Sequence, residues 1–266
     1  MRKYWAIAAA TWQEYVTYRL NLFLEVFGGV LLMLATIALW RTVYITNGNA
    51  MVGTFTLAEM VTYLLVAGVI NSFIWLTAQG DEINDDINQG RLSVWLHRPV
   101  SALGYWFTRD IIRKVMTLLL GGSIFVIVLV AYRSFLVLPS SGSIILFLAA
   151  LLIAGALHFL LFTLFSIIAF WFEQTWGERF LLRVVMEIAA GALIPLSLFP
   201  TFWQTVFAWL PFRFLIAFPA ELFLGKVDAA GILTGFAGAA GWVAAVGVAT
   251  AFVWRRGLAR YTAEGG

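Results

Sequence analysis

Apolar stretches of about 20 residues recur along this chain, and they limit its possible folds more than any other feature. A run of roughly 18 or more apolar residues is long enough to cross a bilayer as a helix. Of the residues, 62% are hydrophobic and 12% are charged, whereas soluble domains are about 45–50% apolar and about 25% charged. We therefore expect an all-α integral membrane protein with several spans.

Six stretches qualify as transmembrane helices, and we expect them to form one domain, residues 1–266, without a linker. The predicted spans are Asn21 to Trp40, Leu57 to Gln79, Val115 to Tyr132, Ile144 to Phe172, Phe180 to Phe199 and Ala229 to Trp254. The connecting segments 41–56 and 133–143 are short and contain Gly, Asn, Ser and Pro, as turns do.

The N-terminal segment, residues 1–20, is predicted to be an amphipathic helix in the membrane interface. Its apolar residues recur at helical spacing: Trp5, Ala9, Trp12 and Val16. The two tryptophans suit the depth of the lipid headgroups. Gln13, Glu14 and Arg19 interrupt the stretch, so it does not resemble a cleavable signal. The alternative is that these residues simply begin the first span.

Residues 200–225 are apolar but are cut by prolines. Pro200, Pro211 and Pro219 leave pieces of about ten residues or fewer, too short to span about 30 Å at ~1.5 Å per residue. We expect a re-entrant hairpin of two half-helices before the last span. One kinked transmembrane helix is the alternative.

The distribution of Lys and Arg predicts the orientation. With six spans and the N-terminus inside, both termini are cytoplasmic and 13 of the 17 basic residues face the cytoplasm. These residues are Arg2, Lys3, Arg19, Arg91, Arg98, Arg109, Arg113, Lys114, Arg179, Arg183, Arg255, Arg256 and Arg260.

Residues 80–114 form the largest predicted internal segment. Four of its acids are expected on one face of a helix: Asp81, Glu82, Asp85 and Asp86. The spacing does not fit a calcium-binding loop. Gly90 is expected to end this helix, and Leu92, Trp95 and Leu96 to make a short apolar stripe beside Arg91 and Arg98. Pro99 breaks the chain, and Ser101 is placed to cap the next helix. A rigid amphipathic element of this kind suits docking against a cytoplasmic partner.

Several of these features together resemble the permease subunits of type-2 ABC exporters. The resemblance is carried by the interfacial helix, the six spans, the stretch "DDINQGRLSVWLHRPVS" and the segment "GALIPLSLFPTFWQTVFAWLPF". The first stretch is similar to the family's acidic–Ile–x–x–Gly–x–Leu–x–x–x–Leu–x–x–Pro pattern, and the second to its re-entrant segment. The resemblance covers nearly the whole chain and is closest to the subgroup with paired, non-identical permeases.

The resemblance implies a membrane subunit driven by a separate ATPase, present in two copies and seated on the loop between spans two and three. The residues implied in this coupling are Asp85, Asp86, Gly90, Arg91, Leu92, Leu96, Arg98 and Pro99. It also implies a second permease, a non-identical homologue or otherwise a second copy, in a bacterial inner membrane. The chain has no GxxxxGK[ST] loop. We therefore expect no cofactor in this chain, with ATP and Mg held by the partner, and no nucleic acid.

Few polar residues lie inside the predicted spans. Arg183 and Glu187 are one turn apart and either pair with each other or contact substrate. His158 is expected to be a core residue, and Gly231 and Gly235 to mark a packing face. No catalytic set is evident, so an enzyme is disfavoured. An exporter of a hydrophobic or amphipathic substrate is the leading hypothesis, and an ATP-independent channel or secondary carrier is the alternative.

Overall fold

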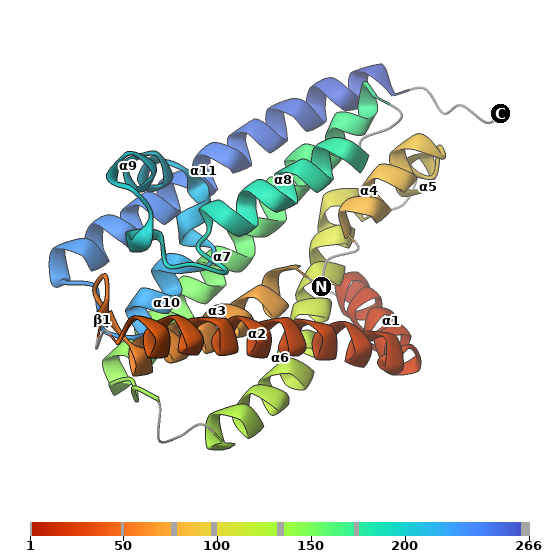
Figure 1. The fold of residues 1–266 in the computed structure, drawn as a ribbon. Helices are drawn as coiled ribbons and strands as arrows, with labels where there is room; N and C mark the ends of the chain where they lie inside the picture. Colours follow the sequence, from red (N-terminus) through yellow and green to blue (C-terminus); the bar gives the residue numbers. More distant parts are fainter. Residues whose placement is uncertain are drawn as a thin grey trace.

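The computed structural model is almost entirely helical (Figure 1) and describes residues 2–48, 51–75, 79–96, 100–131, 136–172 and 176–261. Its α-helices are α1 (Arg2–Thr17), α2 (Arg19–Asn47), α3 (Leu57–Trp75), α4 (Gln79–Asn88), α5 (Leu92–Leu96), α6 (Ala102–Ala131), α7 (Ser141–Ser166), α8 (Trp176–Ala189), α9 (Thr201–Trp209), α10 (Ala217–Phe223) and α11 (Ala229–Arg260). A small antiparallel pair, β1 (Met51–Val52) and β2 (Phe55–Thr56), joins α2 to α3.

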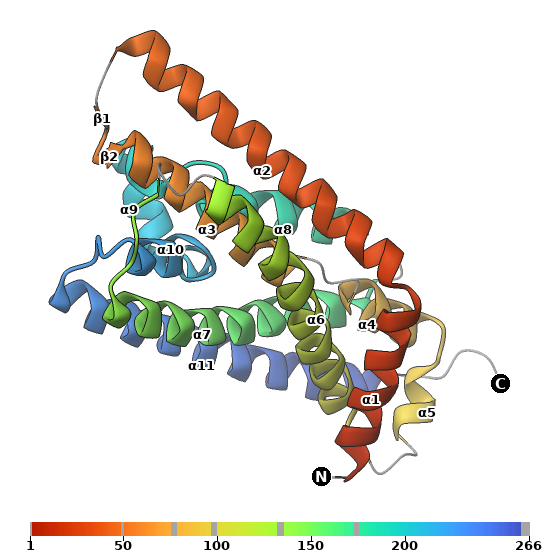
Figure 2. The same cartoon turned by 90° about the horizontal axis from the view of Figure 1, so that it is seen from below.

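The centre of the bundle is α3, which packs against α2, α6, α7 and α10. Its side chains are buried along most of its length, including Tyr63, Ala67, Ile70 and Ile74. Helix α11 runs beside α7 (Figure 2). A helix that is apolar all round, as α3 is, belongs in the interior of such an assembly.

Four described helical segments are long and apolar enough to cross a membrane: Arg19–Thr46, Leu57–Ile74, Ser141–Phe170 and Ala229–Arg260. The bent pair Thr201–Trp209 and Pro211–Phe223 makes five if it counts as one span. The structure therefore bears out an all-α membrane protein, while the count of six spans stays a prediction. Helix α6 has 30 residues and covers the predicted third span as far as Ala131, together with the predicted extension.

The fifth predicted span, 180–199, is wrong as a continuous helix. Helix α8 has 14 residues and ends at Ala189, about 21 Å at ~1.5 Å per residue. Gly191 then takes a left-handed φ of 79°, which ends the helix. The backbone carbonyls left free at the end of α8 accept hydrogen bonds from other parts of the chain. Ala217 N–H donates to the carbonyl of Ala190 at 2.9 Å, and Tyr63 Oη–H donates to the carbonyl of Gly191 at 2.8 Å. Backbone groups shielded from water need such partners.

The proline-cut segment forms two short helical pieces that meet at a bend of 77°. Its second piece packs under α11, where glycines make room for aromatic rings. A Cβ at Gly235 would lie 2.2 Å from the ring of Phe218, and one at Gly238 would lie 2.8 Å from the ring of Phe214. The predicted packing face of α11 therefore receives this segment.

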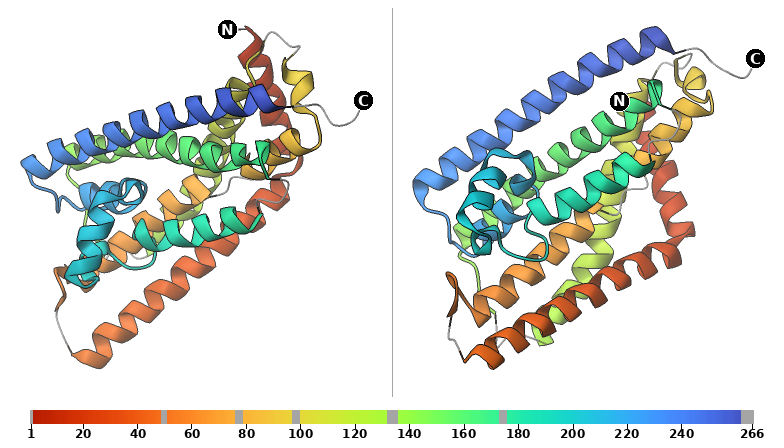
Figure 3. Two further views of the ribbon diagram at one scale, coloured as in Figure 1. Left: turned by 90° about the horizontal axis from the view of Figure 1, so that it is seen from above. Right: turned by 45° about the horizontal axis from the view of Figure 1, so that its top comes forward.

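Helices α1 and α2 are separate, with the break at Tyr18. Helix α1 lies across α6 (Figure 2). Trp5, Trp12 and Val16, from the predicted apolar stripe, are exposed on the side away from the bundle. That orientation suits a helix whose apolar side meets lipid. Helices α1, α4 and α5 and the end of α11 lie at one end of the molecule, and α9 and the β-hairpin lie at the other (Figure 3).

Candidate functional site

The segment predicted to contact a partner is built from α4, α5 and the start of α6. We call residues 79–96 the α4–α5 elbow. Gly90, with a φ of 72°, ends α4 and turns the chain into α5. Ser101 caps α6 as predicted, because its Oγ accepts a hydrogen bond from Gly104 N–H at 3.1 Å.

Asp86 fastens the elbow to the bundle. Its Oδ1 accepts from Arg91 Nε at 2.9 Å, and its Oδ2 accepts from the indole Nε1–H of Trp106 at 3.2 Å. Trp106 is fully buried on α6 and meets Trp254 of α11 edge to face at 5.7 Å. Leu92 lies in the same apolar cluster. The elbow is thereby attached to two long helices.

Two residues of this segment are less accessible than the sequence suggests. The acidic arc of α4 is not solvated throughout, since Asp85 is exposed whereas Asp86 is buried. Leu92 is fully buried, so its side chain is not accessible to a partner in this conformation, and its part in coupling stays a prediction. Of the other predicted residues, Arg91 is half exposed, and Arg98 and Pro99 lie outside the described residues. The structure describes the backbone of Leu96 but not its side chain.

One turn further along α6, Arg109 links three helices. Its guanidinium lies 2.9 Å from Glu14 of α1 and 3.2 Å from Glu82 of α4, measured between charged nitrogens and oxygens. The Tyr105 hydroxyl donates to Glu82 at 3.5 Å. Burial raises the pKa of Glu82, and the positive charge of Arg109 opposes that rise. This group holds α1 and α4 against the same face of α6.

A second ion pair lies deeper in α6. Lys114 pairs with Asp110, one turn away, and donates to the carbonyl of Gly155 on α7 at 3.0 Å. Both side chains are buried. Burial raises the pKa of Asp110, against the effect of Lys114. A buried pair of this kind is costly to break, because the remaining charge loses its partner.

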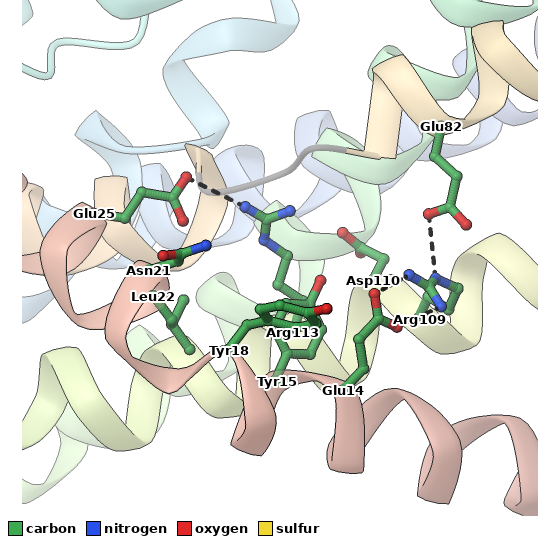
Figure 4. A pocket seen from close by; sticks show the side chains of 10 residues that line it. All are labelled: Glu14, Tyr15, Tyr18, Asn21, Leu22, Glu25, Glu82, Arg109, Asp110 and Arg113. Carbon is green, nitrogen blue, oxygen red and sulfur yellow. Dashed lines mark hydrogen bonds and ion pairs between the residues drawn. The ribbon is translucent and has the colours of Figure 1, made fainter.

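Between the α1–α2 bend and α6 lies a cavity of about 430 Å³ (Figure 4). We call it the bend cavity. Its charged lining residues are Glu14, Glu25, Glu82, Arg109, Asp110 and Arg113. Its remaining lining residues are Tyr15, Tyr18, Asn21 and Leu22. The charged groups converge from α1, α2, α4 and α6, so the cavity exists only when these helices are assembled.

Sequence reasoning missed this cavity and the roles of Glu14, Trp106 and Asp110. The spacing of Asp110 and Lys114, four apart on one helix, is a signal that was available. Glu14 and Arg109 are 95 positions apart in the sequence, so no local sequence pattern predicts that they pair.

The other predicted polar residues lie away from the elbow. Arg183 Nε is 3.5 Å from Glu187 Oε1, and both side chains are partly exposed. His158 is buried on α7, with its ring 4.4 Å from that of Phe162. Among the described residues, no group of three or more His, Asp or Glu could hold a metal ion.

The fold and this site define a multi-pass helical membrane protein with a helical elbow held rigidly at one end of the bundle. Comparison with known families identifies it further. The family model described as ABC-2 family transporter protein matches residues 30–265, so the chain belongs to the ABC-2 transporter family. No curated protein and no solved structure matches the chain.

Membership of this family makes the chain a transmembrane subunit of an ABC transporter. Such a subunit is the membrane component of transport and is not itself catalytic, and its family implies association with an ABC ATPase. The resemblance to an ABC-2 permease, inferred from the sequence, is therefore confirmed. The subgroup with paired, non-identical permeases remains a prediction.

Proposed function

We propose that this chain is the membrane subunit of an ATP-driven exporter and that the α4–α5 elbow receives movement from a separate ATPase. The observation that carries the proposal is the anchoring of the elbow. Asp86 and Trp106 connect it to α6, and Trp254 connects it to α11. Asp85, Arg91 and Val94 remain accessible on its surface. A partner that pushes on these groups moves two long helices with them.

The proposed orientation puts the elbow and both termini in the cytoplasm of a bacterial cell, in its inner membrane. Support comes from the common position of α1, the elbow and the end of α11 (Figure 3). Arg2, Lys3, Arg255, Arg256 and Arg260 lie on the outer parts of α1 and α11 at this end. Lys and Arg favour the cytoplasmic side.

The complex that we propose has two ATPase copies and a second permease, a non-identical homologue or otherwise a second copy of this chain. Exposed apolar faces support a membrane assembly with neighbouring helices or lipid. Helix α8, for example, exposes Phe180, Leu181, Val184 and Ile188. We propose a hydrophobic or amphipathic substrate, which such apolar surfaces can accommodate.

The test is to express the chain with ABC ATPases from its own genome and isolate the complex. We expect co-purification of an ATPase and ATP hydrolysis coupled to transport in vesicles. Val94→Asp on α5, at an exposed position, should uncouple hydrolysis from transport without unfolding the chain, and we expect Leu96→Asp to uncouple them as well. Leu138→Asp is the matched control, because Leu138 is an exposed leucine outside the elbow. Transport by the chain alone, without any ATPase, would instead favour the channel or carrier.

A further inference from the structure

The bend cavity is lined by a buried arginine that has a hydrogen-bond donor without an acceptor among the described residues. Arg113 is more than nine-tenths buried, and its Nε has no hydrogen-bond partner among the described residues. Its one ion pair in that part of the chain is with Glu25, at a long 3.5 Å. An Arg side chain carries five N–H donors, and buried donors normally find acceptors. The geometry therefore points to an anionic group that completes the site.

The remaining charges of the cavity are already compensated. Arg109 pairs with both Glu14 and Glu82, and Lys114 pairs with Asp110. Arg113 and the half-exposed Glu25 are left as a loosely paired cation and anion. A ligand with a phosphate and a cation can match both. A purely anionic ligand would add charge beside Glu25 and Asp110, which opposes binding.

The position of the cavity favours a group found at membrane headgroup depth. It lies at the bend where α1, with its exposed Trp5 and Trp12, passes into the long apolar helix α2. Tyr18 is both exposed and part of the cavity wall. Aromatic residues of this kind collect where headgroups meet hydrocarbon. Next to them, Phe23 and Leu24 expose apolar surface along α2, suited to acyl chains.

We propose that the bend cavity binds a phosphoethanolamine group, with the phosphate on Arg113 and the primary ammonium on Glu25. Guanidinium–phosphate hydrogen bonds are among the strong charge-assisted kind. The ammonium donates hydrogen bonds to a carboxylate, which the quaternary ammonium of choline lacks the N–H groups to do. This proposal rests on the membrane location of the family and is independent of the elbow's role in coupling.

Native mass spectrometry of the full-length chain in detergent tests the proposal. Phosphatidylethanolamine, phosphatidylcholine and phosphatidylglycerol with identical acyl chains are added in turn. We expect phosphatidylethanolamine to be retained about tenfold better, the scale of one charge-assisted contact. Arg113→Gln should abolish the preference. Arg19→Gln is the matched control, since Arg19 is exposed near the same bend but does not line the cavity.

Glu25→Gln provides a variant at a half-exposed position, where folding is little affected. It should remove the preference for phosphatidylethanolamine over phosphatidylcholine. Soluble glycerophosphoethanolamine shows whether the site binds a free headgroup or a membrane lipid. If it displaces the lipid at equal concentration, the site binds the free headgroup. If it does not, the site requires the membrane lipid. Equal retention of all three lipids, or equal losses for Arg113→Gln and Arg19→Gln, would overturn the proposal.

Discussion

Replacing Asp86 by alanine should loosen the α4–α5 elbow, and the size of the effect follows from its two contacts. The ion pair with Arg91 contributes about 0.5 kcal/mol at most, because Arg91 is half exposed and solvent screens the charges. The hydrogen bond from buried Trp106 to a carboxylate contributes more, about 1.5–3 kcal/mol. We therefore expect the free energy of local opening to fall by about 2–3 kcal/mol.

Hydrogen–deuterium exchange in the full-length chain measures this opening directly. A loss of about 2–3 kcal/mol corresponds to exchange roughly 30- to 150-fold faster. The acceleration should appear in the amides of α5 and the end of α4. It should be absent from α9, which lies at the opposite end of the molecule from the elbow (Figure 3).

Asp85→Ala is the matched control, because it removes the same carboxylate one residue away at an exposed position. We expect a change within about 0.5 kcal/mol. Trp106→Phe provides a second comparison: in that background Asp86→Ala should lose most of its effect, since the two residues share one hydrogen bond. If Asp85→Ala and Asp86→Ala accelerate exchange equally, the reasoning about Trp106 is wrong.

Two further predictions concern stability. Because burial raises the pKa of Glu82 above its ordinary 4.5, its ionised form disfavours the folded state, and the free energy of unfolding should fall as pH rises from about 4.5 through the raised pKa. Glu82→Gln should flatten that part of a pH series of thermal unfolding, and an unchanged slope would contradict this assignment. Gly257→Ala would put a Cβ 2.1 Å from the ring of Phe170 and should cost about 1–3 kcal/mol in a denaturant titration. Gly241→Ala, on the same helix with nothing within 4 Å, should not destabilise the chain, and an equal loss there would refute the packing argument.

Local signals in the sequence were enough for the features that depend on local chemistry. The length of the apolar stretches alone predicted α2, α3, α7 and α11. The three prolines predicted the bend between α9 and the helix that follows it. Ser101 and Gly90 could be recognised as helix boundaries because capping is a property of a few neighbouring residues. The same reasoning failed at 180–199, because Gly191 ends α8 only in concert with Tyr63 and Ala217 from elsewhere in the chain.

The candidate site was less accessible to sequence reasoning, for a geometric reason. Asp85 and Asp86 are adjacent on α4, and the helical repeat alone cannot say which of them turns toward α6. That choice depends on where Trp106 and Trp254 meet, a contact between residues 148 positions apart. Leu92 was placed among the coupling residues by the family resemblance, whereas its side chain packs in the apolar cluster that attaches the elbow to the bundle.

The spacing along α6 explains why one helix can serve both the elbow and the bend cavity. Trp106, Arg109 and Arg113 follow one another at three and four residues, so they lie on one face. Trp106 binds α4 through Asp86, Arg109 binds α4 and α1, and Arg113 reaches α2 through Glu25. Under the proposed function, any displacement of the elbow therefore changes the position of α6 relative to the α1–α2 bend. The loose Arg113–Glu25 pair is the weakest of these connections, which makes the occupant of the bend cavity the element best placed to tune how α6 and α2 move together.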